Sequence, residues 1–350
     1  MTEKKPIIIA VDTMGGDNAP DCVIGGLKIA LKKFEAVTFL LFGDEEKVRP
    51  YLEKYKIDEK CYTFVHTTDF VPSDEKPAVA VRTRRSSSMW MAIEAVKKGQ
   101  ADAVVSSGNT GALMALSKII LGTLPAIHRP AILARIPSRY GEYVALDLGA
   151  NAVCDARNLV EFAIMGEVYF RVVTGKSVPT VGLLNIGSEK SKGRDEIKQA
   201  AEILENSPSE TRSFYGFVES DILGENVVDV VVSDGFSGNV MLKTVEGTAK
   251  LILRLFKDFS KDGLLGFLSF VLSIPLLLKL KKKMDPRIYN GGMLIGLKGI
   301  SIKSHGGTDA VGFANAIGVA VNSVQHDLLG QITQNIGSVT FPSTQEENGV

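Results

Sequence analysis

Glycine-rich polar clusters recur along the chain and contain most of the residues that could do chemistry. Six of them are "TMGGDN" at 13–18, "SGNTG" at 107–111, "LGAN" at 148–151, "IGSEKSKG" at 186–193, "DGFSGN" at 234–239 and "GGTD" at 306–309. Glycine lets a backbone approach a ligand closely. Asn, Asp, Ser and Thr cap a following helix, whose free N–H groups and partial positive charge attract anions. Loops that join strands to helices favour the same residues for structural reasons, but the density of these six favours a phosphate or other anion site.

Each cluster follows a short apolar run that is typical of a buried strand. We predict strands at Ile7–Asp12, Val37–Phe42, Tyr62–His66, Ala103–Ser106, Tyr143–Asp147, Thr180–Asn185, Val227–Ser233 and Ile300–Ser304. We predict helices at Cys22–Phe34, Ser87–Lys98, Thr110–Leu121, Asn158–Val173, Asp195–Leu204, Asn239–Phe259 and Ala310–Leu329. This alternation predicts an α/β fold with a mostly parallel sheet. The carboxyl ends of parallel strands share one edge, so we expect the six clusters to meet there.

The composition is that of an ordinary globular protein. The 350 residues are 45% hydrophobic and 23% charged, and 40 basic residues balance 40 acidic ones. We predict a single α/β domain over residues 1–336, followed by a polar tail at 337–350. The zero net charge argues against nucleic acid as a partner. Three widely spaced cysteines and a short apolar N-terminal run predict a cytoplasmic protein without a signal peptide.

Several catalytic and cofactor motifs are absent. No G-x-G-x-x-G follows a predicted strand, and the "TGKS" at 174–177 lacks the earlier glycine of a phosphate-binding loop. The "GFSGN" at 235–239 lacks the final glycine of a nucleophile elbow. The four histidines have no metal-ligand spacing, and we expect Cys154 to be a small buried residue rather than a nucleophile. We therefore predict no cofactor and no metal.

A basic cluster precedes the helix predicted at Ser87–Lys98. It consists of Arg82, Arg84 and Arg85. Such a cluster is either a solvated rim or a docking patch for an acidic partner or a phosphate group.

A second unusual stretch is apolar and then basic. Residues 263–278, "GLLGFLSFVLSIPLLL", contain no charge, and Lys279, Lys281, Lys282 and Lys283 follow. Sixteen helical residues reach only about 24 Å, less than the ~30 Å hydrocarbon core of a membrane. We expect residues 257–287 to form a protruding helical segment that contacts a sister subunit, the membrane surface, or both. The contact candidates are Leu264, Leu265, Phe267, Leu268, Phe270, Leu276, Lys281 and Lys282.

The motifs together resemble one family along the whole chain. "VDTMGGDNAP" at 11–20, "SSGNTGALMA" at 106–115, "DLGAN" at 147–151, "NIGSEKSKG" at 185–193, "SDGFSGNVMLK" at 233–243 and "HGGTDA" at 305–310 closely resemble the bacterial PlsX-type phosphate acyltransferases. Thr13 and Ser107 depart from the usual alanines, and Gly307 and Thr308 from the usual serines.

The resemblance implies both a fold and an activity. It implies a Rossmann-like three-layer α/β/α sandwich, similar to phosphotransacetylases and isocitrate dehydrogenase-type proteins, in a homodimer without a cofactor. It implies transfer of a long-chain acyl group from acyl carrier protein to inorganic phosphate, which yields an acyl phosphate for phospholipid synthesis. It also implies a cytoplasmic protein that can associate peripherally with the membrane.

Phosphate is itself a nucleophile, so the residues need only position it and stabilise an oxyanion. The predicted catalytic residues are Asn185, Lys192, Asn239, Lys243 and His305. The predicted substrate-binding residues are Asp12, Gly15, Gly16, Asp17, Gly108, Asn109, Thr110, Asn151, Asp234 and Gly235. We expect Asp12, Asp17 and Asp234 to brace loops rather than act as bases, and Arg82, Arg84 and Arg85 to dock the acidic carrier.

Three alternatives stay open from the sequence. A phosphotransacetylase-like enzyme would use acyl-CoA with the same chemistry. A membrane-surface scaffold would depend mainly on residues 263–283. A metal- and NAD-dependent decarboxylating dehydrogenase of similar fold is weakly supported, because its adenosine- and metal-binding residues are not identifiable.

Overall fold

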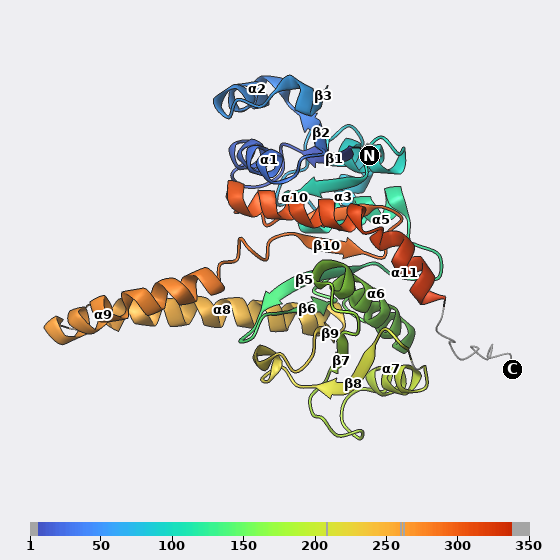
Figure 1. The fold of residues 1–350 in the computed structure, drawn as a ribbon. Coiled ribbons are helices and arrows are strands. Elements are labelled where there is room, and N and C mark those ends of the chain that lie inside the picture. Colours follow the sequence, from blue (N-terminus) through green and yellow to red (C-terminus); the bar gives the residue numbers. More distant parts are fainter. Residues whose placement is uncertain (1–5, 208, 260, 262, 338–350) are drawn as a thin grey trace, which may run out of the picture.

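The computed structural model describes residues 6–207, 209–259, 261 and 263–337, and its centre is one sheet of eleven strands (Figure 1). The strands are β1 (Ile7–Asp12), β2 (Val37–Gly43), β3 (Tyr62–His66), β4 (Ala103–Ser106), β5 (Ala131–Pro137), β6 (Glu142–Leu146), β7 (Thr180–Leu184), β8 (Ser213–Val218), β9 (Val230–Val232), β10 (Gly292–Ile295) and β11 (Ile300–Lys303). Their order in the sheet is β3-β2-β1-β4-β11-β10-β5-β6-β9-β7-β8.

The helices surround this sheet. They are α1 (Asp21–Lys33), α2 (Glu45–Lys54), α3 (Pro77–Thr83), α4 (Ser88–Lys97), α5 (Thr110–Leu121), α6 (Ala156–Thr174), α7 (Asp195–Glu205), α8 (Gly235–Phe259), α9 (Gly263–Lys283), α10 (Ala310–Gln325) and α11 (Leu328–Ile336). Short 3-10 helices occupy Glu59–Cys61 and Leu223–Glu225.

The sheet has two parallel halves that run in opposite directions. Strands β3, β2, β1, β4 and β11 are mutually parallel, and so are β6, β9, β7 and β8. Between the halves, β11 pairs with β10, β10 with β5, and β5 with β6, all antiparallel. Three reversals leave β6 antiparallel to β11. The carboxyl ends of the two halves therefore lie at opposite edges of the sheet.

Helices cover both faces of the sheet, which gives three layers. One core joins β1, β6 and β9 to α1, α6, α10 and α11, and a second joins β4 to α4 and α5. The largest fully buried side chains include Tyr169 and Phe162 of α6 and Phe313 of α10. The predicted α/β class is confirmed.

Most predicted helices and strands are present. The strands and helices that were not predicted, such as β5, β8 and α2, have sequences in which a charge, a glycine or a proline interrupts the expected pattern. Strand β5 carries Arg135, whose charge is offset by Glu142 on β6 at 2.8 Å. Strand β8 contains Gly216 at φ +101°, and α2 contains Pro50. The helix predicted at Ala310–Leu329 is two helices, because Asp327 adopts φ +47° and caps α11.

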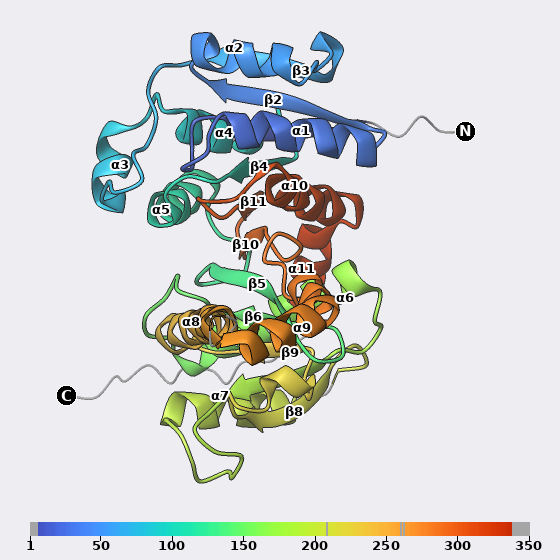
Figure 2. The same cartoon turned by 90° about the vertical axis from the view of Figure 1, so that its left-hand side faces the viewer.

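Helices α8 and α9 form a hairpin that extends away from the body (Figure 1), and Figure 2 views it nearly along α8. The side chains of α8 are mostly exposed from Lys243 onward, ahead of the predicted segment 257–287. Among the described residues, no helix combines the length and apolar content needed to cross a membrane.

Candidate functional site

The loops that follow β1, β4 and β11 form one connected cluster, which we call the first loop cluster (residues 12–20, 106–111 and 303–309). The backbone N–H of Asp17 donates to the carbonyl of Gly306 at 2.9 Å, and the Asn18 side chain donates to the carbonyl of Thr308 at 3.0 Å. The Ser107 hydroxyl donates to the carbonyl of Gly15 at 2.5 Å. Three segments far apart in sequence are thereby held together.

Asp12 is the buried brace of this cluster. Its carboxylate accepts hydrogen bonds from the hydroxyls of Ser88 and Ser106, both at 2.7 Å. The Ser106 oxygen in turn accepts the backbone N–H of Gly108 at 3.0 Å. These bonds occupy both Asp12 oxygens, and the role of Asp12 as a brace rather than a base stays a prediction.

Gly15 and Gly108 touch one another, and Gly15 has no room for a side chain because its neighbour there is the Gly108 backbone. A Cβ on Gly15 would come within 2.6 Å of both the Gly108 nitrogen and an Asp12 oxygen. A Cβ on Gly108 would come within 2.6 Å of the Met89 side chain. Gly16 has φ +101°, which also requires glycine.

A cavity of about 370 Å³ opens between these loops. Its polar wall includes Gly16, Ser107, Gly108, Thr110 and Gly306, and its apolar wall includes Met14, Phe70 and Val71. Helix α5 begins at this wall, and the N–H groups of Thr110 and Gly111 have no acceptor among the described residues. Unsatisfied N–H groups and the positive helix end make the polar wall suited to an anion.

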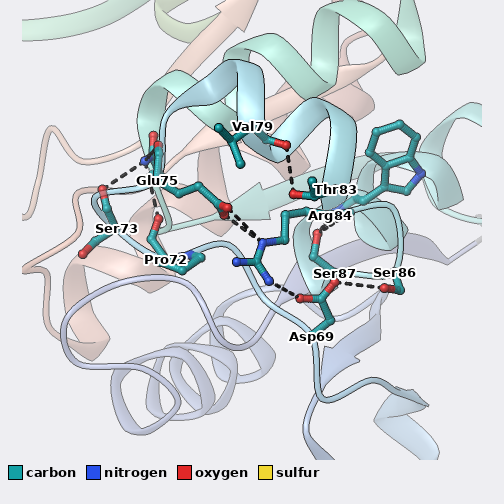
Figure 3. A network of polar contacts seen from close by, with 11 residues as sticks. Asp69, Pro72, Ser73, Glu75, Val79, Thr83, Arg84, Ser86 and Ser87 are labelled. Atoms are coloured by element: carbon teal, nitrogen blue, oxygen red, sulfur yellow. Dashed lines mark hydrogen bonds and ion pairs between the residues drawn. The ribbon is translucent and has the colours of Figure 1, made fainter.

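Residues 67–87 supply the remaining wall, and Arg84 anchors them (Figure 3). Its guanidinium binds Glu75 at 2.9 Å and Asp69 at 3.0 Å, and these two hydrogen bonds raise the pKa of Arg84. Asn109 fastens the same segment, because its side-chain nitrogen donates to the carbonyls of Ser73 at 3.0 Å and Glu75 at 2.8 Å. Its oxygen caps α5 through Ala112. The Arg84 and Asn109 side chains thus hold the cavity wall, and the polar groups of both are already bonded to other residues of the protein.

Lys303 lines the cavity and was not among the predicted site residues. Its ammonium donates to the carbonyls of Ser107, at 3.3 Å, and Ser304. Burial lowers the pKa of Lys303 to about 8, against the opposing influence of Asp12 and Asp17. The signal in the sequence was a single charge at the end of the apolar strand "ISIK", directly before "SHGG".

The loops that follow β6, β7 and β9 form the second loop cluster (residues 147–155, 185–194 and 233–243). Asp147 is its buried brace and accepts the backbone N–H groups of Ile132, Gly149, Ala150 and Asn151 at 2.7–3.1 Å. The backbone of Asn151 accepts the N–H of Gly235 at 2.7 Å, which ties two of the three loops together.

Several predicted residues of the second cluster have structural partners. The side-chain nitrogen of Asn151 donates to Asp147 and to the carbonyl of Pro130. Asn239 donates to the carbonyl of Leu148 at 3.0 Å, and Asn185 to the carbonyls of Gly187 and Lys192. Asp234 caps the start of α8 through Ser237 at 2.8 Å and pairs with Arg194.

The two predicted cations of this cluster are exposed. Lys243 has a side chain that is 68% exposed and lies 3.7 Å from Glu246. Lys192 is also exposed, and its ammonium has no hydrogen-bond or ion-pair partner among the described residues. Neither lysine lines the cavity.

The prediction that all six loops share one edge is wrong. The strands alternate with helices as expected, but the antiparallel β10–β5–β6 connection reverses the second half of the sheet. Among the described residues, no hydrogen bond joins the first loop cluster to the second. Asn151, Asn185, Lys192, Asn239 and Lys243 therefore belong to a separate cluster, and their functional roles stay predictions.

His305 and Cys154 differ in what they can do. The His305 ring is exposed and its Nδ1 accepts the N–H of Gly307 at 3.1 Å, so the neutral ring carries its proton on Nε2. Cys154 is buried, and that burial raises its pKa to about 12. Such a thiol is a poor nucleophile at neutral pH, as predicted.

Comparison with known proteins identifies the family. A family model described as fatty acid synthesis protein matches residues 7–330. The chain belongs to this family. Members named phosphate acyltransferase include the Rhodospirillum rubrum protein, 52% identical over 97% of each chain, and the Rhodospirillum centenum protein, 54% identical over 91% of this chain and 89% of its own. The resemblance to PlsX-type phosphate acyltransferases and the prediction of an enzyme of this type are confirmed.

Solved structures share the fold at much lower identity. The EutD phosphotransacetylase from Staphylococcus aureus has a TM-score of 0.61 and 15% identity, and covers 91% of this chain and 94% of its own. A phosphotransacetylase from Streptococcus pyogenes has the same TM-score and identity, with coverages of 93% and 95%. The fold of this family member is therefore of the predicted phosphotransacetylase-like kind.

Proposed function

We propose that the protein transfers a fatty acyl group from acyl carrier protein to inorganic phosphate and releases an acyl phosphate. The observation that carries this proposal is the cavity of the first loop cluster. It joins unsatisfied N–H groups at the start of α5 to an apolar wall of Met14, Phe70 and Val71. The polar wall suits phosphate, and the apolar wall suits the adjoining acyl thioester.

The proposed chemistry requires no covalent enzyme intermediate. A phosphate oxygen attacks the thioester carbonyl, the carbonyl oxygen takes up negative charge, and the carbon–sulfur bond then breaks to release the carrier thiol. Correct positioning contributes roughly 7–11 kcal/mol in well-oriented systems. One donor to the oxyanion is typically worth ~2.7–4 kcal/mol. The N–H groups of Thr110 and Gly111 are suited to both tasks, and the backbones of Gly15, Gly16 and Gly108 shape the space around them.

We assign a supporting role to the second loop cluster. At the opposite edge of the sheet from the cavity, Asn185 and Asn239 would hold the loops in place, and Lys192 and Lys243 would supply positive charge. His305, in the first loop cluster, would protonate the leaving thiolate. Exposure of both lysines and of the His305 ring is consistent with these roles.

The decisive experiment is a phosphate-dependent deacylation assay that detects acyl phosphate directly. We expect the product with acyl carrier protein as donor and much less with acyl-CoA. The reverse preference would favour the phosphotransacetylase-like alternative. Asn239→Ala and Lys243→Ala are tested in the same assay, and unchanged kcat/KM in both folded variants would remove them from the site.

The α8–α9 hairpin suggests a second role at the membrane surface. Apolar side chains exposed on it are Val245, Leu251, Ile252, Leu253, Leu255 and Phe256 of α8 and Val271, Leu272, Ile274, Leu276 and Leu278 of α9. An apolar surface of this extent normally contacts a partner or a lipid. Exposed Lys279, Lys282 and Lys283 would meet anionic headgroups.

The predicted contact residues divide into two groups. Leu276 and Lys282 are exposed, and Phe270 is half-buried. The side chains of Leu264, Leu265, Phe267, Leu268 and Lys281 lie outside the described residues. A homodimer formed through the same hairpin is part of this proposal, because a sister subunit could cover one face while the other meets lipid.

A further inference from the structure

We propose that Lys303 is a catalytic residue that binds the phosphate nucleophile through its ammonium group. The inference rests on the proposed phosphate site and adds a cation to the three glycine-rich loops at 13–18, 107–111 and 306–309, which contain no Lys or Arg. Lys303 is the last residue of β11 and lines the same cavity wall as Gly108 and Thr110. A cation and the positive end of α5 thus border one space.

The charge of Lys303 has no direct counter-ion. Its two hydrogen bonds go to the carbonyls of Ser107 and Ser304, and no carboxylate lies within ion-pair distance among the described residues. An ammonium group has three hydrogens, so one remains for a ligand. Lys303 is half-buried, and a partly buried, unpaired charge carries a desolvation cost that a bound dianion offsets.

The neighbouring carboxylates do not act as the counter-ion of Lys303. Both oxygens of Asp12 are occupied by Ser88, Ser106 and the backbone of Met14. Asp17 lines the cavity from its exposed side and forms no ion pair among the described residues. The free hydrogen of Lys303 therefore belongs to an anion that enters the cavity.

A purely structural role is the competing explanation, because Lys303 also ties β11 to the loop after β4. The two roles predict different kinetics. A brace supports the whole loop cluster, so its loss would affect both substrates. A residue that binds phosphate affects only KM for phosphate, so its loss would leave KM for the acyl thioester unchanged.

Lys303→Met is the primary variant, and Lys298→Met is its matched control. Lys298 lies in the turn between β10 and β11, at the other end of β11 from Lys303, and is exposed. We expect Lys303→Met to raise KM for phosphate at least about tenfold and to lower kcat/KM for phosphate about 100-fold, with KM for the acyl thioester unchanged. Lys303→Arg should restore part of the loss, and Lys298→Met should behave as wild type. Equal increases in both KM values would overturn the proposal.

Calorimetric titration with phosphate alone tests the site without an acyl donor. We expect binding by wild type and not by Lys303→Met. Binding by both proteins overturns the role of Lys303 and leaves the proposed function standing. Binding that depends on Lys303, without acyl phosphate formation, overturns the proposed function instead. Absence of phosphate binding by wild type overturns both.

The pH dependence gives a test that does not rely on the folding of Lys303→Met. With a pKa of about 8, Lys303 loses its charge as the pH rises through that value, so phosphate affinity of wild type should fall between pH 7 and pH 9. Phosphate itself becomes more negative over this range, which would by itself favour binding. Asp12 and Asp17 are the titratable groups whose charges act on the ammonium, and His305 follows two residues later in the chain. Lys303→Arg keeps its charge at every pH in this range, so its affinity should not fall. A similar fall in Lys303→Arg would contradict the assignment.

Discussion

At the scale of single residues, the first loop cluster depends on close backbone contact between two glycines. Gly15 and Gly108 come from loops more than ninety residues apart, and their backbones are in contact. The Asp12–Ser106–Gly108 chain of hydrogen bonds holds that contact in place. Cavity shape is therefore sensitive to one added methyl group.

Gly15→Ala should reduce activity strongly and destabilise the fold by about 1–3 kcal/mol, as overpacking of a tight site does. The added Cβ would meet backbone atoms of Gly108, which cannot move aside without shifting α5. Activity and urea denaturation measure the two effects.

Gly247→Ala is the matched control, because a Cβ there meets no atom within 4 Å. It lies inside α8, so alanine should stabilise the helix by about 0.5–1 kcal/mol and leave activity unchanged. Equal losses of activity and stability in Gly15→Ala and Gly247→Ala would mean that the contact between Gly15 and Gly108 does not determine either property.

At the scale of elements, the wall formed by residues 67–87 separates two functions that the sequence placed in one basic cluster. Arg84 is committed to Asp69 and Glu75 inside the wall. Arg82 is exposed, and Arg85 is exposed with its guanidinium 5.7 Å from the Trp90 ring centroid. Arg82 and Arg85 therefore remain the candidates for carrier docking.

We expect Arg84→Gln to raise KM for a short acyl thioester and for the carrier-bound donor alike, by about three- to tenfold, because it loosens the cavity wall. Charge reversal of Arg82 and Arg85 together should raise KM for the carrier-bound donor alone. It should also make that KM less dependent on salt concentration than in wild type. Steady-state kinetics with both donors separate the two. An unchanged KM for the carrier-bound donor after charge reversal would rule out this docking surface.

At the scale of the whole molecule, the α8–α9 hairpin is the feature that the globular body does not explain. Leu272, with 76% of its surface exposed, stands at a position where burial within the chain provides no stabilisation. The apolar surface of the hairpin becomes favourable only when lipid or a sister subunit covers it.

Leu272→Glu should weaken sedimentation with anionic vesicles by about tenfold, because it places a negative charge in the apolar surface opposite anionic headgroups. Ile119→Glu is the matched control, since Ile119 on α5 is also exposed, at 56%. Equal vesicle binding by the two variants would contradict a membrane role. A loss of dimer in Leu272→Glu, measured by sedimentation velocity, would instead assign the surface to the sister subunit.

Local patterns in the sequence were enough for the α/β class, the family and the residues of the glycine-rich loops. The reason is that strand burial, helix capping and close backbone approach each depend on neighbouring residues. The motifs around Gly15, Gly108 and Asp147 mark positions whose contacts are short and tolerate few residue types.

Only the tertiary structure decided which loops meet and which side chains are free. The antiparallel strands β10 and β5 had weak patterns, yet they reverse the second half of the sheet and divide six similar loops into two clusters. The sequence predicted that Asn109 binds substrate and that Arg84 docks the carrier. In the structure, Asn109 donates to the carbonyl of Glu75 and Arg84 pairs with the Glu75 carboxylate. Lys303 looked like an ordinary strand end, and its place in the cavity depends on loops nearly two hundred residues away, because strand pairing and burial join segments whose proximity no local pattern records.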